Sequence, residues 1–178
     1  SYILDIGIGN GCALIENKKL IKSKNLKIFG IDNDPGAILL AKSNIEDNDL
    51  KNHIEVEYQN IEKLNKTEKY DYVFFSNSFS LIDNIPEVLC NIKNKFLKED
   101  GKIVISTTIE NKEDKLKSKI KENAKNILFG IDFGRLTTIC DFVNQIASLN
   151  LKINNMKLVY NTWYPLWGNV NIYTFFIE

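Results

Sequence analysis

The chain has 178 residues, of which 44% are hydrophobic and 26% charged, a composition typical of one globular domain with its own core. Lysine plus arginine and aspartate plus glutamate each number 23, so the formal net charge is zero and the chain has no general attraction to nucleic acid. No apolar run reaches the roughly 18 residues that a membrane span needs. The three cysteines are widely spaced, which argues against a metal site and indicates buried thiols in a reducing cytoplasm.

Short apolar runs alternate with helical patterns over the first part of the chain. Strands are expected at residues 2–6, 27–31, 53–58, 70–76 and 102–108, and helices at 12–21, from Pro35 and from Pro86. An Asp100-Gly101 turn is expected to lead into the fifth strand. Alternation of this kind predicts a parallel sheet covered by helices on both faces. Because Ser1 already lies in a strand-like stretch, we expect upstream residues to be missing.

The pattern changes after the fifth strand. A lysine-rich insert at residues 110–135, expected to act as a lid, precedes a helix through Phe142 and Ile146 and two strands at 152–160 and 171–177. The last two strands are joined by a short loop, so they should pair antiparallel. The predicted fold is α/β: one domain over residues 1–178, with a Rossmann-like, doubly wound, seven-stranded sheet that is mostly parallel and has an antiparallel last strand.

A glycine-rich stretch, ILDIGIGNG at residues 3–11, follows the first strand. Gly7, Gly9 and Gly11 allow a turn with unusual φ values and keep Cβ atoms away from a ligand, and the next helix offers free N–H groups. Asp32 ends the second strand, where a carboxylate can accept hydrogen bonds from two ribose hydroxyls. These features predict a cofactor that contains adenosine, bound at the carboxyl edge of the sheet.

The loop differs from the dinucleotide fingerprint G-x-G-x-x-G/A. Counted from Gly7 and Gly9, the third member of that fingerprint falls on Cys12. Asp5 also places a negative charge directly at the loop, which is unfavourable beside a pyrophosphate and favourable beside an ammonium group. The spacing therefore argues against NAD or FAD.

At this point the chain resembles the class I S-adenosylmethionine-dependent methyltransferases. Five segments resemble the family's motifs in order: ILDIGIGNG, IFGIDNDPGAILLAKSNI, EVEYQNIEKL, YDYVFFSNSFSLI and VLCNIKNKFLKEDGKIVIS. The resemblance covers residues 2–177 and implies S-adenosylmethionine as the cofactor and S-adenosylhomocysteine as the product. It also implies that Asp5 orients the amino group of the methionine part, and that Gly7, Gly9, Asn10 and Gly11 wrap this end of the cofactor.

The resemblance assigns further cofactor contacts after the second, third and fourth strands. Asp32 would hold the ribose, Asn33 would border the adenine, and Ser76 would lie near the reactive methyl. Asn60 and Ile61 fall where the family has an acidic residue on the adenine amino group and then an apolar residue. Asn60 is a departure from that pattern, because an amide accepts the same bond without a charge.

Plainer interpretations of these residues stay open. Gly7 and Gly9 could serve only a tight turn, and Asp32 could be a helix cap before Pro35. Asn60 could be an ordinary loop amide.

The methyl acceptor is less well marked, and no catalytic residue is assigned. A substrate pocket is expected near Asn77, Phe79, Arg135, Trp163, Tyr164 and Trp167. The aromatic residues among them could instead cap the core. The only histidine, His53, starts the third strand at the edge opposite the cofactor, so a histidine base is not supported. We expect methyl transfer to a small molecule. The alternatives are an RNA or protein acceptor, or a cofactor-binding scaffold without turnover. The oligomeric state is left open.

Overall fold

The computed structural model describes residues 1–110, 137–164 and 168–178. They divide into two compact units: Ser1–Ser76 with Pro86–Val104, called the first unit, and Asn77–Ile85 with Ile105–Glu178, called the second unit. Residues 111–135 of the expected insert lie outside the described residues. The organisation as a single domain stays a prediction.

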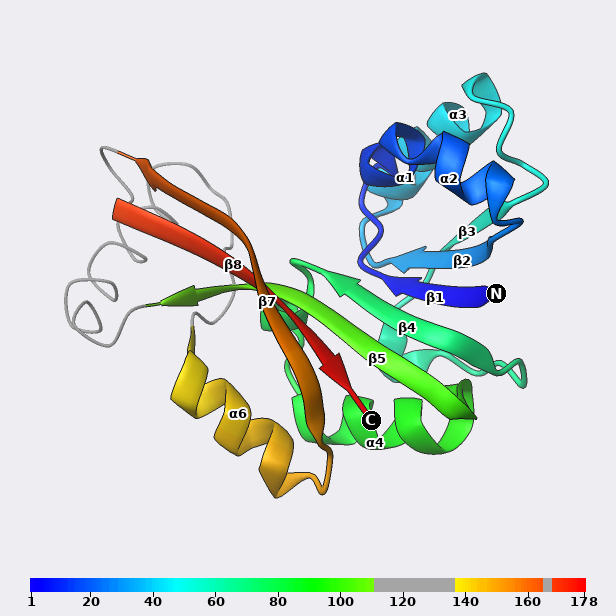
Figure 1. The fold of residues 1–178 in the computed structure, drawn as a ribbon. Coiled ribbons are helices and arrows are strands. Elements are labelled where there is room, and N and C mark those ends of the chain that lie inside the picture. The colour runs from blue at the N-terminus through cyan, green and yellow to red at the C-terminus, as the bar shows by residue number, and fades with distance from the viewer. Residues whose placement is uncertain (111–136, 165–167) are drawn as a thin grey trace. The chain divides into compact units, whose positions relative to one another are not determined.

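The first unit is built on parallel strands. They are β1 (Tyr2–Ile6), β2 (Lys27–Asp32), β3 (Ile54–Tyr58), β4 (Tyr70–Ser76) and the start of β5 (Leu97–Glu110). Their order is β3-β2-β1-β4-β5, with β1 parallel to both β2 and β4 and β2 parallel to β3 (Figure 1). The apolar runs of β1 and β4 are buried, as at Leu4, Val73 and Phe75. All of these strands begin within one residue of the predicted position except β5.

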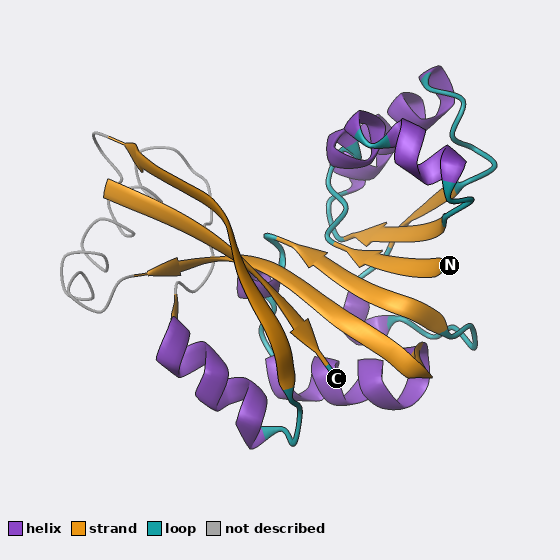
Figure 2. Cartoon of the chain, viewed as in Figure 1, coloured by secondary structure: helices purple, strands orange, loops and turns teal. Residues whose placement is uncertain are grey.

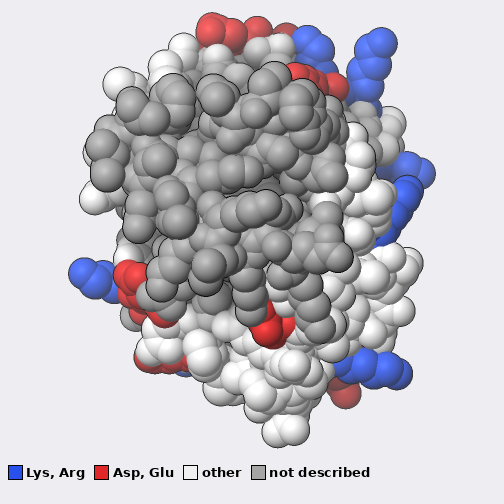
Figure 3. Space-filling model, turned by 90° about the vertical axis from the view of Figure 1, so that its left-hand side faces the viewer, with Lys and Arg blue, Asp and Glu red and all other residues white. Residues whose placement is uncertain are grey.

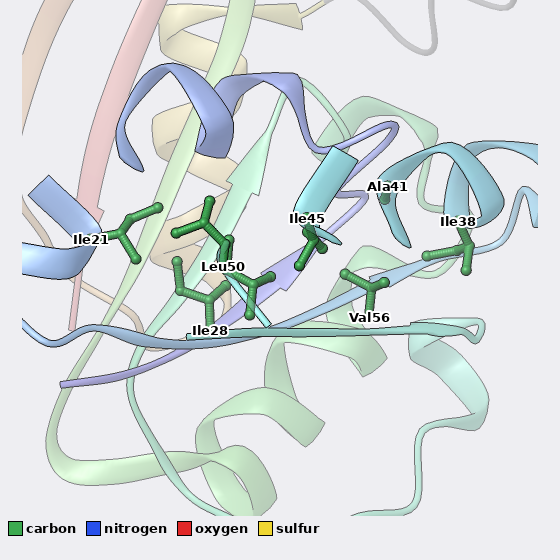
Figure 4. Packing of buried hydrophobic residues seen from close by; sticks show 8 residues of the cluster. Ile21, Ile28, Ile38, Ala41, Ile45, Leu50 and Val56 are labelled. Atoms are coloured by element: carbon green, nitrogen blue, oxygen red, sulfur yellow. The ribbon is translucent and has the colours of Figure 1, made fainter. Parts of the chain in front are cut away.

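Helices lie on both sides of these strands (Figure 2). They are α1 (Cys12–Glu16), α2 (Lys18–Ser23), α3 (Pro35–Asp47), the 3-10 turn η1 (Ile61–Lys63), α4 (Ile85–Asn91) and the π-helical turn η3 (Ile92–Phe96). Ile38, Ala41 and Ile45, at helical spacing on α3, pack against Ile28 of β2 and Val56 of β3 (Figure 4). Complete burial of each such isoleucine contributes about 1.5–3 kcal/mol before entropy costs.

The predicted helix at residues 12–21 is two short helices that meet at Asn17. The side-chain amide of Asn17 donates to the carbonyl of Ala13 at 2.8 Å, and its backbone N–H donates to Leu14 instead of Ala13. In a continuous helix, the backbone N–H of Asn17 would donate to the carbonyl of Ala13, but here the side chain of Asn17 binds that carbonyl. Leu39 of α3 is 70% exposed and does not share the buried face of this helix.

Strand β5 begins at Leu97, five residues before the predicted start. A Cβ atom placed on Gly101 would lie 2.8 Å from Cγ of Leu97, although these residues are four apart in sequence. Residues four apart in an extended strand are about 13 Å apart, so the chain turns back sharply here. This contact fits the predicted Asp100-Gly101 turn.

Three helices end with a residue in the left-handed conformation. Asn25, Asp49 and Asn150 have φ values of 47°, 55° and 55°, and each follows a helix by two residues. After each of them, the next N–H bonds back across the last turn, as Leu50 does to the carbonyl of Ile45 at 3.0 Å. Asn77 is the fourth residue other than glycine with a positive φ in the described ranges, and it follows strand β4 instead of a helix.

In the described residues of the second unit, the helix α6 accompanies a hairpin. Its elements are η2 (Phe79–Leu81), the end of β5, β6 (Thr137–Thr138), α6 (Ile139–Ser148), β7 (Ile153–Tyr164) and β8 (Gly168–Ile177). The strand order is β5-β8-β7, with β6 pairing β5 in parallel. Strands β7 and β8 are antiparallel, as predicted, and β8 runs opposite to β5 (Figure 1). The core of the unit stacks Phe142 of α6 between Phe79 and Phe175.

Three details of the second unit and of the cysteines differ from the predictions. The hairpin strands extend further than expected, to Tyr164 and from Gly168, and β6 was not predicted. Cys12, Cys90 and Cys140 are exposed, which makes the prediction of buried thiols wrong. Cys90 and Cys140 lie on the solvent sides of α4 and α6, whose buried positions are taken by larger apolar residues. No helix in the described ranges is long and apolar enough to span a membrane.

Candidate functional site

The site lies at the carboxyl ends of the parallel strands of the first unit. Because β1, β2, β3 and β4 run in the same direction, the residues that follow them gather at one edge of the sheet. The glycine loop follows β1, and Asp32 is the last residue of β2. Asn60 comes two residues after β3, and Ser76 ends β4. All predicted cofactor residues therefore belong to this unit.

The glycine loop needs its glycines. Gly7, Gly9 and Gly11 have φ values of 78°, 60° and 75°, a region that other residues enter at a cost. The loop is tied to β2, because the N–H groups of Gly7 and Ile8 both donate to the carbonyl of Ile31, at 2.8 and 3.1 Å. At Gly9 a Cβ atom would meet nothing within 4 Å, so only the backbone conformation demands glycine there and the space beside it is open.

Asp32 organises the loop with its carboxylate. One oxygen accepts the N–H of Gly9 at 2.8 Å, and the other accepts the N–H of Asp34 at 3.0 Å. Asp32 is not the cap of α3. That cap is Asp34, whose Oδ1 accepts from Gly36 at 2.7 Å and from Ala37 at 3.3 Å. The interpretation of Asp32 as a helix cap is therefore wrong.

Asp5 is a buried acid beside this loop. Its side chain is 4% exposed, and its Oδ1 has no hydrogen-bond partner among the described residues. Burial, followed by the negative charge of Asp32, raises the pKa of the Asp5 carboxyl to about 7. A buried carboxylate without a partner is costly, so this position favours either a proton or a cation supplied by a ligand.

The segment after β3 is fixed by Asn60. Its Oδ1 accepts the N–H of Glu62 at 2.8 Å and caps the 3-10 turn η1, which begins with the partly buried Ile61. An amide oxygen has a second lone pair, so the cap does not exclude a further donor. Asn33 is exposed directly after β2, and Ser76 is partly buried at the end of β4.

Sequence reasoning missed two residues that position the loop, Gly30 and Asn44. A Cβ atom on Gly30 would lie 2.3 Å from Cδ1 of Ile8, so this glycine lets the loop lie close over β2. Asn44 of α3 donates to the backbone carbonyl of Asn10 at 2.9 Å. The glycine inside the apolar run IFGID was the available signal for Gly30, because glycine within a strand often marks a close approach. No local pattern marks Asn44.

The predicted substrate residues belong to the second unit or lie outside the described residues. Asn77 is exposed, has a φ of 56°, and donates from its N–H to the carbonyl of Ser106 at 2.8 Å. Phe79 is 3% exposed and packs edge-on against Phe142, with ring centroids 5.7 Å apart. Trp163 and Tyr164 lie in β7, and Arg135 and Trp167 lie outside the described residues. Their contact with a substrate stays a prediction.

His53 lies away from the glycine loop, as expected. It precedes β3, and its Nδ1 is 3.0 Å from the carbonyl of Leu26, which precedes β2. Both residues are at the amino ends of parallel strands, opposite the edge that carries the loop. Among the described residues, no group of histidine, cysteine, aspartate and glutamate is arranged to hold a metal ion.

Comparisons with known proteins agree with this geometry. A family model described as "Methyltransferase domain" matches residues 1–162. A ribosomal protein L11 methyltransferase of Dictyoglomus turgidum is 33% identical over 127 residues, which are 71% of this chain and 39% of that protein. The chain thus spans about two fifths of this relative's length.

Solved structures share the fold. One is a methyltransferase from Thiobacillus denitrificans in complex with S-adenosyl-L-homocysteine, with a TM-score of 0.74 and 12% identity. The match covers 100% of this chain and 84% of that chain. A geranyl diphosphate C-methyltransferase from Streptomyces coelicolor has a TM-score of 0.74 and 12% identity, with 99% of this chain and 72% of that chain covered. These identities are low, so the likeness shows the fold alone. The predicted fold class and the predicted S-adenosylmethionine cofactor of the family are confirmed. With a family model that matches residues 1–162, the chain belongs to the class I S-adenosylmethionine-dependent methyltransferases.

Proposed function

We propose that this chain binds S-adenosylmethionine at the glycine loop of the first unit and is the catalytic part of an enzyme that methylates a protein. The observation that carries the proposal is Asp5, whose buried carboxylate has an oxygen without a partner beside three glycines of positive φ. The amino-acid end of the cofactor carries an ammonium group, which has three donors and a positive charge. The residues present therefore fit this cofactor.

The roles of Asp5 and the loop follow from charge and space. An ammonium group near Asp5 supplies the hydrogen bond that Oδ1 lacks and favours the ionised carboxylate. The open space at Gly9 lets the cofactor approach the backbone without meeting a Cβ atom. Asn10, within the same loop, is held in place by Asn44, so the loop does not have to be ordered when the cofactor binds.

Asp32 is positioned for the ribose hydroxyls. Both of its carboxylate oxygens already accept one backbone N–H each, from Gly9 and Asp34, and each retains a lone pair for a hydroxyl donor. The backbone bonds also fix the orientation of the carboxylate before the cofactor arrives. Asn60 and Ile61, with Asn33, are proposed to border the adenine, and Ser76 is proposed to lie near the transferred methyl.

Bound S-adenosylmethionine supplies a methyl group on a sulfonium, which is already activated for in-line attack. The chain then has to align the acceptor and exclude water, and it needs a base only for an acceptor that arrives protonated. Since the only histidine is His53, at the other edge of the sheet, we propose that no imidazole takes part. Positioning is proposed to provide most of the rate enhancement.

A protein acceptor is favoured by the relatives. At 33% identity, the relative from Dictyoglomus turgidum is named for ribosomal protein L11, whereas the geranyl diphosphate methyltransferase shares only 12%. On the face seen in Figure 3, both acidic and basic side chains of the described residues are visible. The formal net charge of zero gives little support to a nucleic-acid acceptor. Transfer to a small molecule, the expectation from the sequence, stays a prediction.

Two measurements test the proposal. Calorimetric titration with S-adenosylmethionine should show binding that Asp32→Ala weakens by about tenfold or more, because charge-assisted hydrogen bonds are worth roughly 1.5–3 kcal/mol. Unchanged affinity in this variant would contradict the site.

Methyl-labelled cofactor is then incubated with the chain and with separate protein, RNA and metabolite pools. Label in the protein pool supports the proposed acceptor class, and label only in the metabolite or RNA pool replaces it. Cofactor binding without transfer to any pool favours a non-catalytic scaffold.

A further inference from the structure

A cavity in the first unit lies away from the glycine loop. It has a volume of about 300 Å³, near the lower limit for ligand-binding pockets. Its wall includes Lys27 and His53, at the amino ends of β2 and β3. Because the strands are parallel, this end of the sheet is opposite the end that carries the glycine loop. The cavity is therefore separate from the proposed cofactor site.

Three polar side chains that line this cavity lack partners. Tyr70 is 5% exposed, yet its hydroxyl forms no hydrogen bond with any residue that the structure describes. Glu55 and Glu68 line the same cavity, and their carboxylates form no ion pair within the described ranges. The Tyr70 hydroxyl and the carboxylates of Glu55 and Glu68, two exposed residues, are therefore acceptors that a ligand with N–H groups can reach from the cavity.

Three glutamate carboxylates act on the hydroxyl of Tyr70. Burial is the largest cause that raises the pKa of the Tyr70 hydroxyl, and the charges of Glu68, Glu55 and Glu57 add to it and bring the pKa to about 12. The hydroxyl is therefore neutral at physiological pH and can accept a hydrogen bond.

Two lysines of the wall already have acceptors. Lys27 donates to the backbone carbonyl of Asn52 at 2.6 Å, and Lys51 is paired with Glu46. Each of these two ammonium groups is thus engaged by an acceptor other than Tyr70.

An ammonium group already occupies part of this wall. Nζ of Lys66 lies 3.8 Å from the centroid of the Phe29 ring and 3.4 Å from a carboxylate oxygen of Glu57. An aromatic face beside a carboxylate attracts a cation through both the ring quadrupole and the charge. The rings of Phe29, Tyr2 and Tyr70 all line the cavity. Nζ of Lys98 lies 5.3 Å from the centroid of the Tyr2 ring, so Tyr70 is the ring of these three with no such lysine among the described residues.

We propose that this cavity binds a small aliphatic amine in its ammonium form, held by Tyr70, Glu55 and Glu68 over the aromatic wall. An ammonium group has three donors and no acceptor, which matches three acceptor groups without donors. A neutral alcohol of the same length lacks the charge, and an anion would be repelled by the two carboxylates. The site is independent of the proposed methyl transfer.

The test compares 1,4-diaminobutane, n-butylamine and 1-butanol by calorimetric titration and by backbone amide NMR of the whole chain. Saturable binding is expected for both amines and not for the alcohol, with shifts at residues 53–55 and 66–70. Glu68→Gln and Glu55→Gln should each weaken amine binding by about three- to tenfold, as expected for a partly exposed charged contact. Glu99→Gln, an exposed carboxyl outside the cavity, is the matched control and should leave binding unchanged.

Lys66→Met gives a second, opposite prediction. This substitution removes the ammonium group of Lys66 from the face of the Phe29 ring, so the affinity of the chain for the added amines should rise by about two- to fivefold. Lys69→Met, outside the cavity wall, removes the same charge nearby and should change affinity less. Equal binding of 1-butanol, no saturable binding of either amine to the folded chain, or unchanged affinity in both glutamate variants would overturn the proposal.

Discussion

The first unit and the second unit differ in how the sequence specifies them. In the first, short motifs determine the structure: glycines of positive φ, the carboxylates of Asp5 and Asp32, and a proline at the start of α3. In the second, a stack of aromatic rings on α6 and β8 supports a long hairpin, with few local motifs. The comparison shows that the part proposed to bind the cofactor can be recognised from sequence, whereas the other part is specified mainly by packing.

The largest change in the free energy of unfolding is expected for a substitution in the second unit. Phe142 has no exposed surface and contacts the rings of Phe79 and Phe175, the latter with centroids 4.2 Å apart. Phe142→Ala should lower the free energy of unfolding by about 3–5 kcal/mol, because it leaves a cavity in this core. Urea denaturation measures the loss. Val143→Ala, on the exposed side of the same helix, is the control, and an equal loss there would show that the aromatic stack is not the source of the stability.

The next effect is a gain of stability in the first unit. The raised pKa of Asp5 means that the folded chain holds its proton more tightly than the unfolded chain, so stability without cofactor falls as the pH rises from about 4 to about 7. Asp5→Asn removes this loss and should stabilise the chain by about 2–4 kcal/mol near pH 8, with little change near pH 4. Thermal denaturation across this pH range measures it. A gain that does not depend on pH would contradict the burial of a charged Asp5.

Gly9 tests whether the loop needs its backbone conformation. Since there is open space around its Cβ position and φ is 60°, Gly9→Ala should cost about 1–2 kcal/mol through the backbone alone. Gly9→Asn should cost less, because asparagine tolerates the left-handed region. Urea denaturation of the two variants compares them, and equal costs would point to a steric cause instead.

The smallest expected loss of stability comes from Asp34, and it distinguishes the role of Asp34 from that of Asp32. Asp34→Ala should lower the free energy of unfolding by about 1 kcal/mol, because it removes the acceptor for the N–H groups of Gly36 and Ala37. Its affinity for S-adenosylmethionine should stay near that of the unchanged chain, since the cap is not among the proposed cofactor contacts. Loss of affinity equal to that of Asp32→Ala would mean that the cap also holds the cofactor.

Most of the fold was predictable because the central parallel strands β1, β2 and β4 are largely apolar, β3 alternates in a strand pattern, and the loops carry distinctive residues. Asp5, Gly9 and Asp32 could be identified because acidic residues at the end of a buried strand, and glycines directly after it, are typical of a loop that approaches a ligand closely. The break at Asn17 was not predictable, because it depends on whether one side chain takes a backbone carbonyl. The same holds for Asn44 and for the exposed cysteines, whose positions depend on which helical face packs against the sheet.

The central claim is that the buried carboxylate of Asp5 pairs with the ammonium group of S-adenosylmethionine. Calorimetric titration of the unchanged chain and of Asp5→Asn, at about pH 6 and about pH 8, tests it most directly. Because the pKa of Asp5 is about 7 without the cofactor, the unchanged chain should bind about tenfold more weakly at the lower pH. Asp5→Asn should bind weakly at both pH values, with little difference between them. Affinity that is independent of pH in the unchanged chain, or undiminished in the variant, would contradict the account.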